Sequence, residues 1–322
     1  MEWQHSIYLY PYDLKGVRFL KNHSPRLSRS KQGTIRSPYS LWMASPALLV
    51  YTVLFILPAG VGIIMSFFNA NSFQLSKMTW AGLTNFKNVF SDPYINVAIK
   101  NTLLFAIVTT IGKTGLGLLL ALFVNHKFRG ANYLRTVFFL PAILSNVAVG
   151  LVFRSMMHPN GLINQALVQF GLEAWKQNWL TDPKIAIFSC AFVEIWKWSG
   201  YSMVIFLAGL QSIDVTYYEA AQLDGATPWQ RFRNITLPLI IPAFNNALII
   251  NIVGGLKVFD LVQTLTKGGP GSATSVFGTL IYSSFSNGNY GRGCAASVIL
   301  TIFVVLIALP TNQYLSGKEV EA

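Results

Sequence analysis

Long apolar runs alternate with shorter polar stretches along this chain. A bilayer-spanning helix needs about 20 mostly apolar residues. The apolar runs are continuous rather than alternating in polarity, so they predict helices and not the strands of a barrel. We therefore expect an all-α, polytopic membrane protein with about six transmembrane helices. The six predicted spans are residues 41–69, 102–125, 138–152, 185–213, 237–259 and 293–315.

Composition supports this class. The 322 residues are 52% hydrophobic and only 11% charged, whereas soluble domains carry about 25% charged residues. The net charge of +12 would suggest nucleic acid as the partner of a soluble protein, but Lys and Arg that flank membrane spans explain it here, and we expect no nucleic acid. Cys190 and Cys294 lie in apolar runs, and the chain predicts neither a disulfide nor a metal site.

Basic residues predict the orientation. If the spans are numbered in order, thirteen Lys and Arg fall on the side of the N-terminus and eight on the other side. The positive-inside rule therefore predicts that both termini and the loop of residues 214–236 are cytoplasmic. The expected domains are a basic segment (1–40), a transmembrane domain (41–315) and a tail (316–322). The basic segment has too much charge for a signal peptide, and both an amphipathic surface helix and disorder fit it.

The loop 214–236 carries local signals for two short helices joined by a tight turn. Residues 216–223 predict a helix that Gly225 ends, because a left-handed cap is cheapest at glycine. Thr227 then suits an N-cap, and Pro228 suits the first position of a second helix. An ordinary amphipathic surface loop is the alternative that spacing alone leaves open.

The same loop resembles the cytoplasmic signature of permease subunits of bacterial binding-protein-dependent ABC importers. That signature is Glu-Ala-Ala, three residues, Gly, nine residues, Ile, one residue and Leu-Pro, and it is matched by Glu219-Ala220-Ala221, Gly225, Ile235 and Leu237-Pro238. Three other strings resemble the sugar-type branch, which includes the maltose and glycerol-phosphate permeases: Gly161-Leu162-Ile163-Asn164, residues 207–213 and residues 265–270. The resemblance extends over residues 40–315.

This resemblance implies a non-catalytic subunit of the inner membrane. The chain has no Gly-x-x-x-x-Gly-Lys-[Ser/Thr] loop, so ATP and Mg²⁺ are expected in a partner and no cofactor in this chain. The implied partners are a second permease subunit, two ATPase subunits and an extracytoplasmic substrate-binding protein. The resemblance implies that a groove on the ATPase receives the helix predicted at residues 216–223. The alternative for Glu219 is that it is only a solvated charge on the helix surface. The implied coupling residues are Tyr218, Glu219, Ala220, Ala221, Asp224, Gly225 and Arg231.

The fourth predicted span contains ionisable residues, which are costly in a membrane and usually functional. Glu194, Lys197, Trp198 and Tyr201 are spaced i, i+3, i+4 and i+7 and share one helical stripe. Aromatic faces and polar groups together suit a saccharide, whereas a Glu194–Lys197 ion pair that only joins helices is the alternative. By resemblance to the maltose-type permease, residues of the fifth span complete the pathway. The full candidate set is Glu194, Lys197, Trp198, Tyr201, Asn251, Gly255 and Lys257.

By this resemblance, three positions of the fifth span, Gly254, Gly255 and Val258, lack the bulkier or amide side chains of the maltose relative, which argues against maltose itself. Lys197 and Lys257, with Lys113 if it faces inward, favour an acidic solute such as a uronate oligosaccharide or a phosphorylated polyol. Alternatively, Lys257 extends to the outer surface and Glu194 neutralises Lys197.

The expected function is ATP-driven import of a saccharide. A glycerol-phosphate-type importer subunit is one alternative. A self-contained secondary transporter is another, but it would need a coupling-ion site and usually has internal repeats. A membrane sensor or assembly protein that uses the 214–236 loop for docking is the third.

Overall fold

A computed structural model describes residues 41–71, 78–126 and 128–317. The predicted basic segment 1–40 and residues 318–322 of the predicted tail lie outside the described residues. The chain divides into two units, Met1–Leu54 and Phe55–Ala322. The described part of the first unit holds a 3₁₀ turn η1 (Leu41–Ala44) and helix α1 (Ser45–Tyr51), which has a proline in its first turn, where the missing N–H costs nothing. A π-helical segment η2 (Thr52–Ile56) follows.

The described part of the second unit is almost entirely helical. Two short antiparallel strands, β1 (Phe68–Asn69) and β2 (Thr79–Trp80), pair with Phe68 opposite Trp80. The shorter helical elements are α2 (Leu57–Met65), α3 (Thr84–Phe90), α7 (Leu162–Gln169), η4 (Glu173–Trp175), α9 (Val215–Leu223), α10 (Pro228–Arg231), η5 (Phe232–Thr236), α11 (Leu237–Leu239), α13 (Asp260–Leu265) and α14 (Phe277–Ser286). The longer helices are α4 (Ile95–Asn125), α5 (Ala131–Ile143), α6 (Asn146–Met156), α8 (Ala186–Ser212), α12 (Ile241–Leu256) and α15 (Tyr290–Ser316).

The helices confirm the all-α membrane class. Among the described residues, three helices are long and apolar enough to cross a membrane: Trp42–Met65, α4 and α15. Two helix pairs meet the same criteria only together, and each pair is sharply bent. Helix α8 is one continuous helix of 27 residues over the predicted fourth span. The number of crossings and the side on which the termini lie stay predictions.

The third and fifth predicted spans are not single straight helices, which corrects the sequence-based boundaries. Helix α5 contains Pro141, which removes a backbone donor, and the chain turns by 94° before α6 begins. The segment Pro228–Leu239 meets α12 at 62°. Helix α12 then ends at Leu256 rather than at residue 259, directly after two glycines that favour helix poorly.

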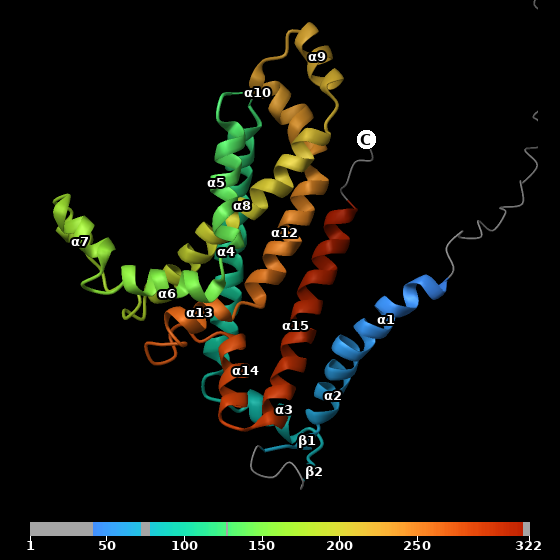
Figure 1. Ribbon diagram of the computed structural model, residues 1–322, viewed down its shortest axis with the longest axis vertical. Helices are drawn as coiled ribbons and strands as arrows, with labels where there is room; N and C mark the ends of the chain where they lie inside the picture. The colour runs from blue at the N-terminus through green and yellow to red at the C-terminus, as the bar shows by residue number, and fades with distance from the viewer. Residues whose placement is uncertain (1–40, 72–77, 127, 318–322) are drawn as a thin grey trace, which may run out of the picture. The chain divides into compact units, whose positions relative to one another are not determined.

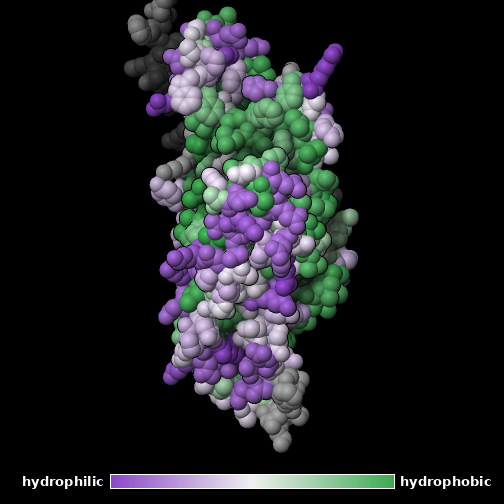
Figure 2. Space-filling view, turned by 90° about the vertical axis from the view of Figure 1, so that its left-hand side faces the viewer, coloured by the Kyte–Doolittle hydropathy of each residue, from purple (hydrophilic) through white to green (hydrophobic). Residues whose placement is uncertain are grey.

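Helix α4 is the central element of the second unit. It packs along α8 and α12, while α5 packs on α8 (Figure 1). Fully buried apolar side chains such as Phe105 of α4 and Phe206 of α8 fill these contacts. Apolar side chains also remain on outer surfaces, as Figure 2 shows for one face. This pattern fits a bilayer, because lipid gives no hydrophobic reason to bury them.

The two ends of the second unit are formed by different elements. Helices α9 and α10 form one end, and α3, α14 and the β1–β2 pair form the other (Figure 1). The long helices α4 and α15 run between these ends, and the breaks of α5–α6 and α12–α13 fall between them. The second unit therefore presents a helical loop at one end and places two helix breaks in its middle, where the polar residues of the fourth span also lie.

Candidate functional site

A cavity of about 380 Å³ lies where α12 gives way to α13. That volume falls in the range of small-molecule sites, about 300–1,000 Å³. Helices α4, α8 and α12 supply most of its wall. The lining combines charged, amide, aromatic and aliphatic side chains from Lys113, Asn146, Glu194, Trp198, Tyr201, Ile250, Asn251, Gly254, Lys257, Val258, Phe259, Asp260 and Leu261.

Two other cavities differ in character. One of about 400 Å³ between β1, α3 and the start of α15 is lined mainly by asparagines, with Asp92 and Arg292. The other, about 720 Å³ beside α7, is lined mostly by apolar residues. Neither combines aromatic rings with charged groups, as the cavity at the α12–α13 break does. We therefore take the cavity at the α12–α13 break as the candidate site.

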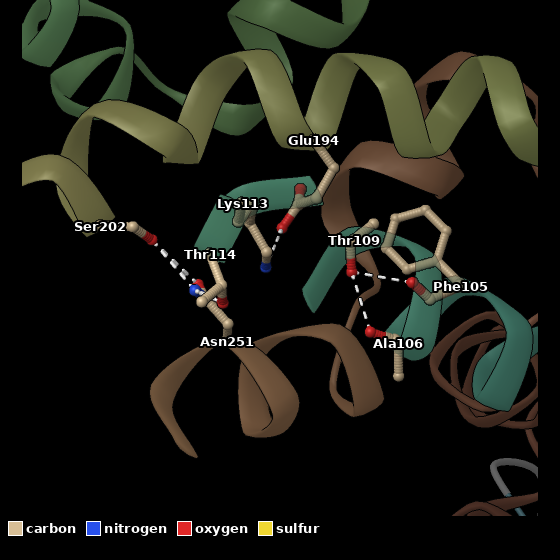
Figure 3. A network of polar contacts seen from close by, with 8 residues as sticks. All are labelled: Phe105, Ala106, Thr109, Lys113, Thr114, Glu194, Ser202 and Asn251. Carbon is tan, nitrogen blue, oxygen red and sulfur yellow. Dashed lines mark hydrogen bonds and ion pairs between the residues drawn. The ribbon is translucent and has the colours of Figure 1, made fainter. Parts of the chain in front are cut away.

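Lys113 of α4 and Glu194 of α8 form an ion pair in the wall of this cavity (Figure 3). The Nζ atom lies 3.6 Å from Oε1, and the two side chains are only 3% and 9% exposed. A single buried charge costs several kcal/mol, and a close partner offsets that cost. The pair joins two helices that are far apart in sequence. The ion pair of Glu194 with Lys197, which the sequence left open as an alternative, is not the one formed.

Lys197 turns away from the cavity toward α5. Its Nζ atom donates a hydrogen bond to the Ala142 carbonyl at 3.3 Å and lies 4.1 Å from the centre of the Trp198 ring. Ala142 is in the last turn of α5, where backbone carbonyls lack helical partners and attract cations. Lys197 therefore donates a hydrogen bond to a carbonyl at the end of α5, beside the 94° bend. This contact explains why Lys197 is buried without a ligand.

Asn251 of α12 joins three helices. Its Nδ2 atom donates to Thr114 Oγ1 of α4 at 3.1 Å and to Ser202 Oγ of α8 at 3.0 Å (Figure 3). At the opposite part of the cavity, Asn146 at the start of α6 donates to Asp260 Oδ2 at the start of α13 at 3.3 Å. These polar contacts hold the helices that form the wall.

Of the seven predicted pathway residues, five line the cavity and two do not. The five are Glu194, Trp198, Tyr201, Asn251 and Lys257. Lys197 donates its hydrogen bond to the Ala142 carbonyl of α5. Gly255 is buried against the Ala106 backbone of α4, and a Cβ on Gly255 would come within 2.7 Å of the Ala106 Cα. The rings of Trp198 and Tyr201 meet edge to face, with their centroids 6.0 Å apart.

Sequence reasoning did not select Asn146 and Asp260, and it gave Lys113 only a conditional place. The available signal was a polar residue inside a predicted span for Asn146 and a polar residue directly after a predicted span for Asp260. For Lys113 it was a lone charge inside a predicted span, which is costly unless it faces protein or water.

The loop 214–236 confirms the predicted pair of short helices. Asp214 caps α9 by accepting a hydrogen bond from the Thr216 backbone N–H at 2.9 Å, which lowers the pKa of its carboxyl. This cap is therefore intact at neutral pH and is lost as pH falls through the lowered pKa. The chain turns at Gly225 with φ of +76°, which a residue with a Cβ disfavours. Thr227 and Gln230 then form a reciprocal capping box at the start of α10.

The surface of this loop carries large exposed apolar side chains. Leu223 is 89% exposed and Trp229 is 66% exposed. Tyr218 instead faces inward, where its hydroxyl hydrogen-bonds to Thr236 Oγ1 at 3.0 Å. Among the other predicted coupling residues, Glu219, Ala220, Asp224 and Gly225 are exposed, and Ala221 and Arg231 are half-buried.

Replacing Thr227 with alanine is expected to destabilise α10 by about 1 kcal/mol, because one side of the capping box is lost. Hydrogen exchange of the backbone amides of residues 229–231 should accelerate by about fivefold, the factor that such a free-energy change gives. Substitution of the exposed Gln222 in α9 is the matched control and should leave these amides unchanged. Equal exchange in both variants would show that the cap does not hold this turn.

Residues 113–314 match the family described as binding-protein-dependent transport system inner membrane component, and the chain belongs to this family. It is thus an integral inner-membrane protein of the ABC-importer class. Within that class, its similarity to sugar permeases assigns it to carbohydrate transport, which confirms the resemblance seen in the loop motif.

The relatives span several solutes. A probable ABC transporter permease protein, PH1215, from Pyrococcus horikoshii is 34% identical over 81% of this chain and 94% of its own length. The lactose transport system permease protein LacF of Rhizobium radiobacter is 30% identical over 86% of this chain and 94% of its own. The sn-glycerol-3-phosphate transport system permease protein UgpA of Escherichia coli is 32% identical over 87% and 94%.

A solved structure also resembles this fold. It is a bacterial ABC transporter involved in the import of the acidic polysaccharide alginate, with a TM-score of 0.75 and 28% identity over 86% of this chain and 94% of that chain. A second structure shows the bacterial alginate transporter in complex with alginate pentasaccharide-bound periplasmic protein, with a TM-score of 0.73 and 27% identity over 85% of this chain and 92% of that chain.

Proposed function

We propose that this chain forms one half of the translocation pathway of an ATP-driven saccharide importer. In this proposal a second permease subunit forms the other half, two ATPase subunits bind ATP and Mg²⁺, and a substrate-binding protein delivers the solute. The cavity at the α12–α13 break, with Trp198, Tyr201 and several polar groups in its wall, is the observation that carries the proposal. Indole and phenol rings stack on the apolar faces of sugars, while amide and charged groups hydrogen-bond their hydroxyls.

The loop 214–236 is the proposed contact with the ATPase. Asp214 and Thr227 cap the starts of its two helices, and the chain turns between the helices at Gly225. Leu223 and Trp229 expose apolar surface at one end of the unit, which is typical of a protein–protein contact. A change of state in the ATPase can move this chain only if the ATPase contacts the chain differently in its two states. The loop that makes this contact must therefore be rigid.

The alternatives differ in what drives transport. The alginate importer structure contains a periplasmic protein, which supports a binding protein in this system too. A glycerol-phosphate-type importer would keep the same partners and change the solute. A self-contained secondary transporter would work without an ATPase, and a sensor would move no solute.

The test is ATP-driven uptake by the native assembly. Tagged chain is purified from its own membranes in mild detergent, and the co-purifying proteins are identified. The assembly is then placed in liposomes with and without internal ATP, and uptake of radiolabelled mono- and oligosaccharides is measured. We expect an ATPase to co-purify and uptake to require ATP. Uptake by the chain alone under an ion gradient would support the secondary transporter.

Replacing Leu223 with aspartate is expected to reduce ATP-driven uptake several-fold, because a charge would enter the apolar docking surface. Substitution of the neighbouring Gln222 with aspartate adds the same charge to an exposed polar position of α9 and should have a much smaller effect. ATPase recovery is measured in parallel, since weakened docking should lower both. An undiminished uptake rate in the Leu223 variant would remove this residue from the contact.

A further inference from the structure

Charge is balanced in the wall of the candidate cavity. Four ionisable side chains are among its lining residues: Lys113, Glu194, Lys257 and Asp260. Two are basic and two are acidic, and no arginine is among the described lining residues. A site for a carboxylated or phosphorylated solute requires an excess of cationic donors, for which arginine is the usual choice.

Two of the three buried charges in this region, those of Lys113 and Glu194, cancel within the protein. Lys113 and Glu194 contact each other at 3.6 Å and are nearly inaccessible to water. The pair has zero net charge whether the proton resides on the amine or on the carboxyl. The Lys113 ammonium is therefore already neutralised. The carboxylate of an acidic solute would be repelled by the Glu194 carboxylate as well as attracted by Lys113.

The two other ionisable lining residues carry charges of opposite sign. Lys257 follows the last residue of α12 and Asp260 begins α13, and both are exposed. They contribute one charge of each sign to the same rim. Lys197, the other cation of this region, is buried against the Ala142 carbonyl and the Trp198 ring and does not face the cavity.

We propose that this half of the pathway selects an uncharged saccharide over a uronate or a phosphorylated one, and that Glu194 sets this selectivity by neutralising Lys113. The inference rests on the proposed function and names the substrate class of the same site. The family does not decide the matter, because relatives include permeases named for lactose and for sn-glycerol-3-phosphate, and a solved neighbour imports acidic alginate. In this chain the uncharged aromatic and polar groups in the cavity wall are the rings of Trp198, Tyr201 and Phe259 and the amides of Asn146 and Asn251.

The direct test measures binding to the purified native assembly. Equilibrium dialysis compares radiolabelled glucose disaccharides with matched disaccharides in which one glucose is replaced by glucuronate. We expect the wild-type assembly to bind the neutral series at least tenfold more tightly. A preference of the wild type for the glucuronate series would overturn the proposal.

Variants separate the role of Glu194 from a general effect on folding. Glu194→Gln leaves Lys113 unneutralised and should shift the ratio of the two affinities toward glucuronate by at least tenfold. The double variant K113M/E194Q removes both charges and should keep the wild-type preference. Asp260→Asn also removes one acidic charge, but at an exposed rim where water screens it, so its shift should be smaller.

The results distinguish this inference from the function on which it rests. Equal shifts in E194Q and K113M/E194Q would show that the Lys113 charge does not set selectivity. If E194Q does not assemble, the wild-type comparison and the double variant still decide the question. Failure of an ATPase to co-purify, or binding of neither disaccharide series, would instead overturn the saccharide importer and this inference with it.

Discussion

Replacing Gly200 with alanine is expected to cause the largest loss of stability of any single methyl group added to this chain. Helices α5 and α8 meet backbone to backbone at this point, and a Cβ on Gly200 would overlap the Phe138 carbonyl oxygen and crowd the Phe139 Cα. Overpacking usually costs about 1–3 kcal/mol and sometimes more. Here the obstructing atoms belong to a helix backbone and cannot rotate away, so we expect a cost at or above the upper end of that range.

The measurement is the thermal stability of the detergent-purified assembly, followed by size-exclusion chromatography after heating. Gly115→Ala is the matched control, since Gly115 lies inside α4 with no atom within 4 Å of the position that a Cβ would occupy, and alanine favours helix by about 1 kcal/mol over glycine. We expect Gly115→Ala to be neutral or stabilising. Similar melting temperatures for the two variants would mean that α5 and α8 do not approach as closely as the structure shows.

Removing the Glu194 carboxylate is expected to destabilise the protein at least as much as Gly200→Ala. Glu194→Ala leaves the Lys113 ammonium buried without its partner, and breaking a buried ion pair in this way costs about 3–5 kcal/mol. Replacing both partners with apolar residues of similar size is often neutral. The double variant K113M/E194L should therefore recover most of the stability that Glu194→Ala loses.

A double-mutant cycle on these two positions provides the measurement. Unfolding free energies are determined for wild type, K113M, E194L and K113M/E194L in the same detergent. A coupling energy close to zero would show that the two side chains do not interact in the folded protein. Substitution of Ile250, an exposed residue in the same wall, controls for a general sensitivity of this region.

The two short helices of the loop 214–236 were predictable because their signals are local. A glycine at positive φ, an N-cap threonine and a proline in the first turn each act within a few residues, and all three are found where the sequence places them. The all-α class was predictable for a similar reason, since the length of an apolar run reports directly on a membrane helix.

The partners within the site were not predictable in this way. Glu194 and Lys197 are three residues apart on one helix, which made them appear to be a pair. The structure instead pairs Glu194 with Lys113 of another helix and turns Lys197 to the carbonyl end of α5. Periodicity places residues on a stripe, but it does not say which neighbouring helix supplies a charge or an unsatisfied carbonyl. The bend after α5 was missed because the mostly apolar residues 138–152 on both sides of it were interpreted as one span.

Two contacts between α5 and α8 restrict how this unit can move. The backbone contact at Gly200 leaves no room for sliding, and the hydrogen bond from Lys197 to Ala142 ties the end of α5 to α8. These two helices therefore form a single rigid body. Any rearrangement that opens the cavity must pivot elsewhere, and the exposed hydrogen bond between Asn146 and Asp260 crosses the place where the rigid body ends. A hinge is thus expected at residues 144–146, between the pair α5–α8 and helix α6, which packs on α13 instead.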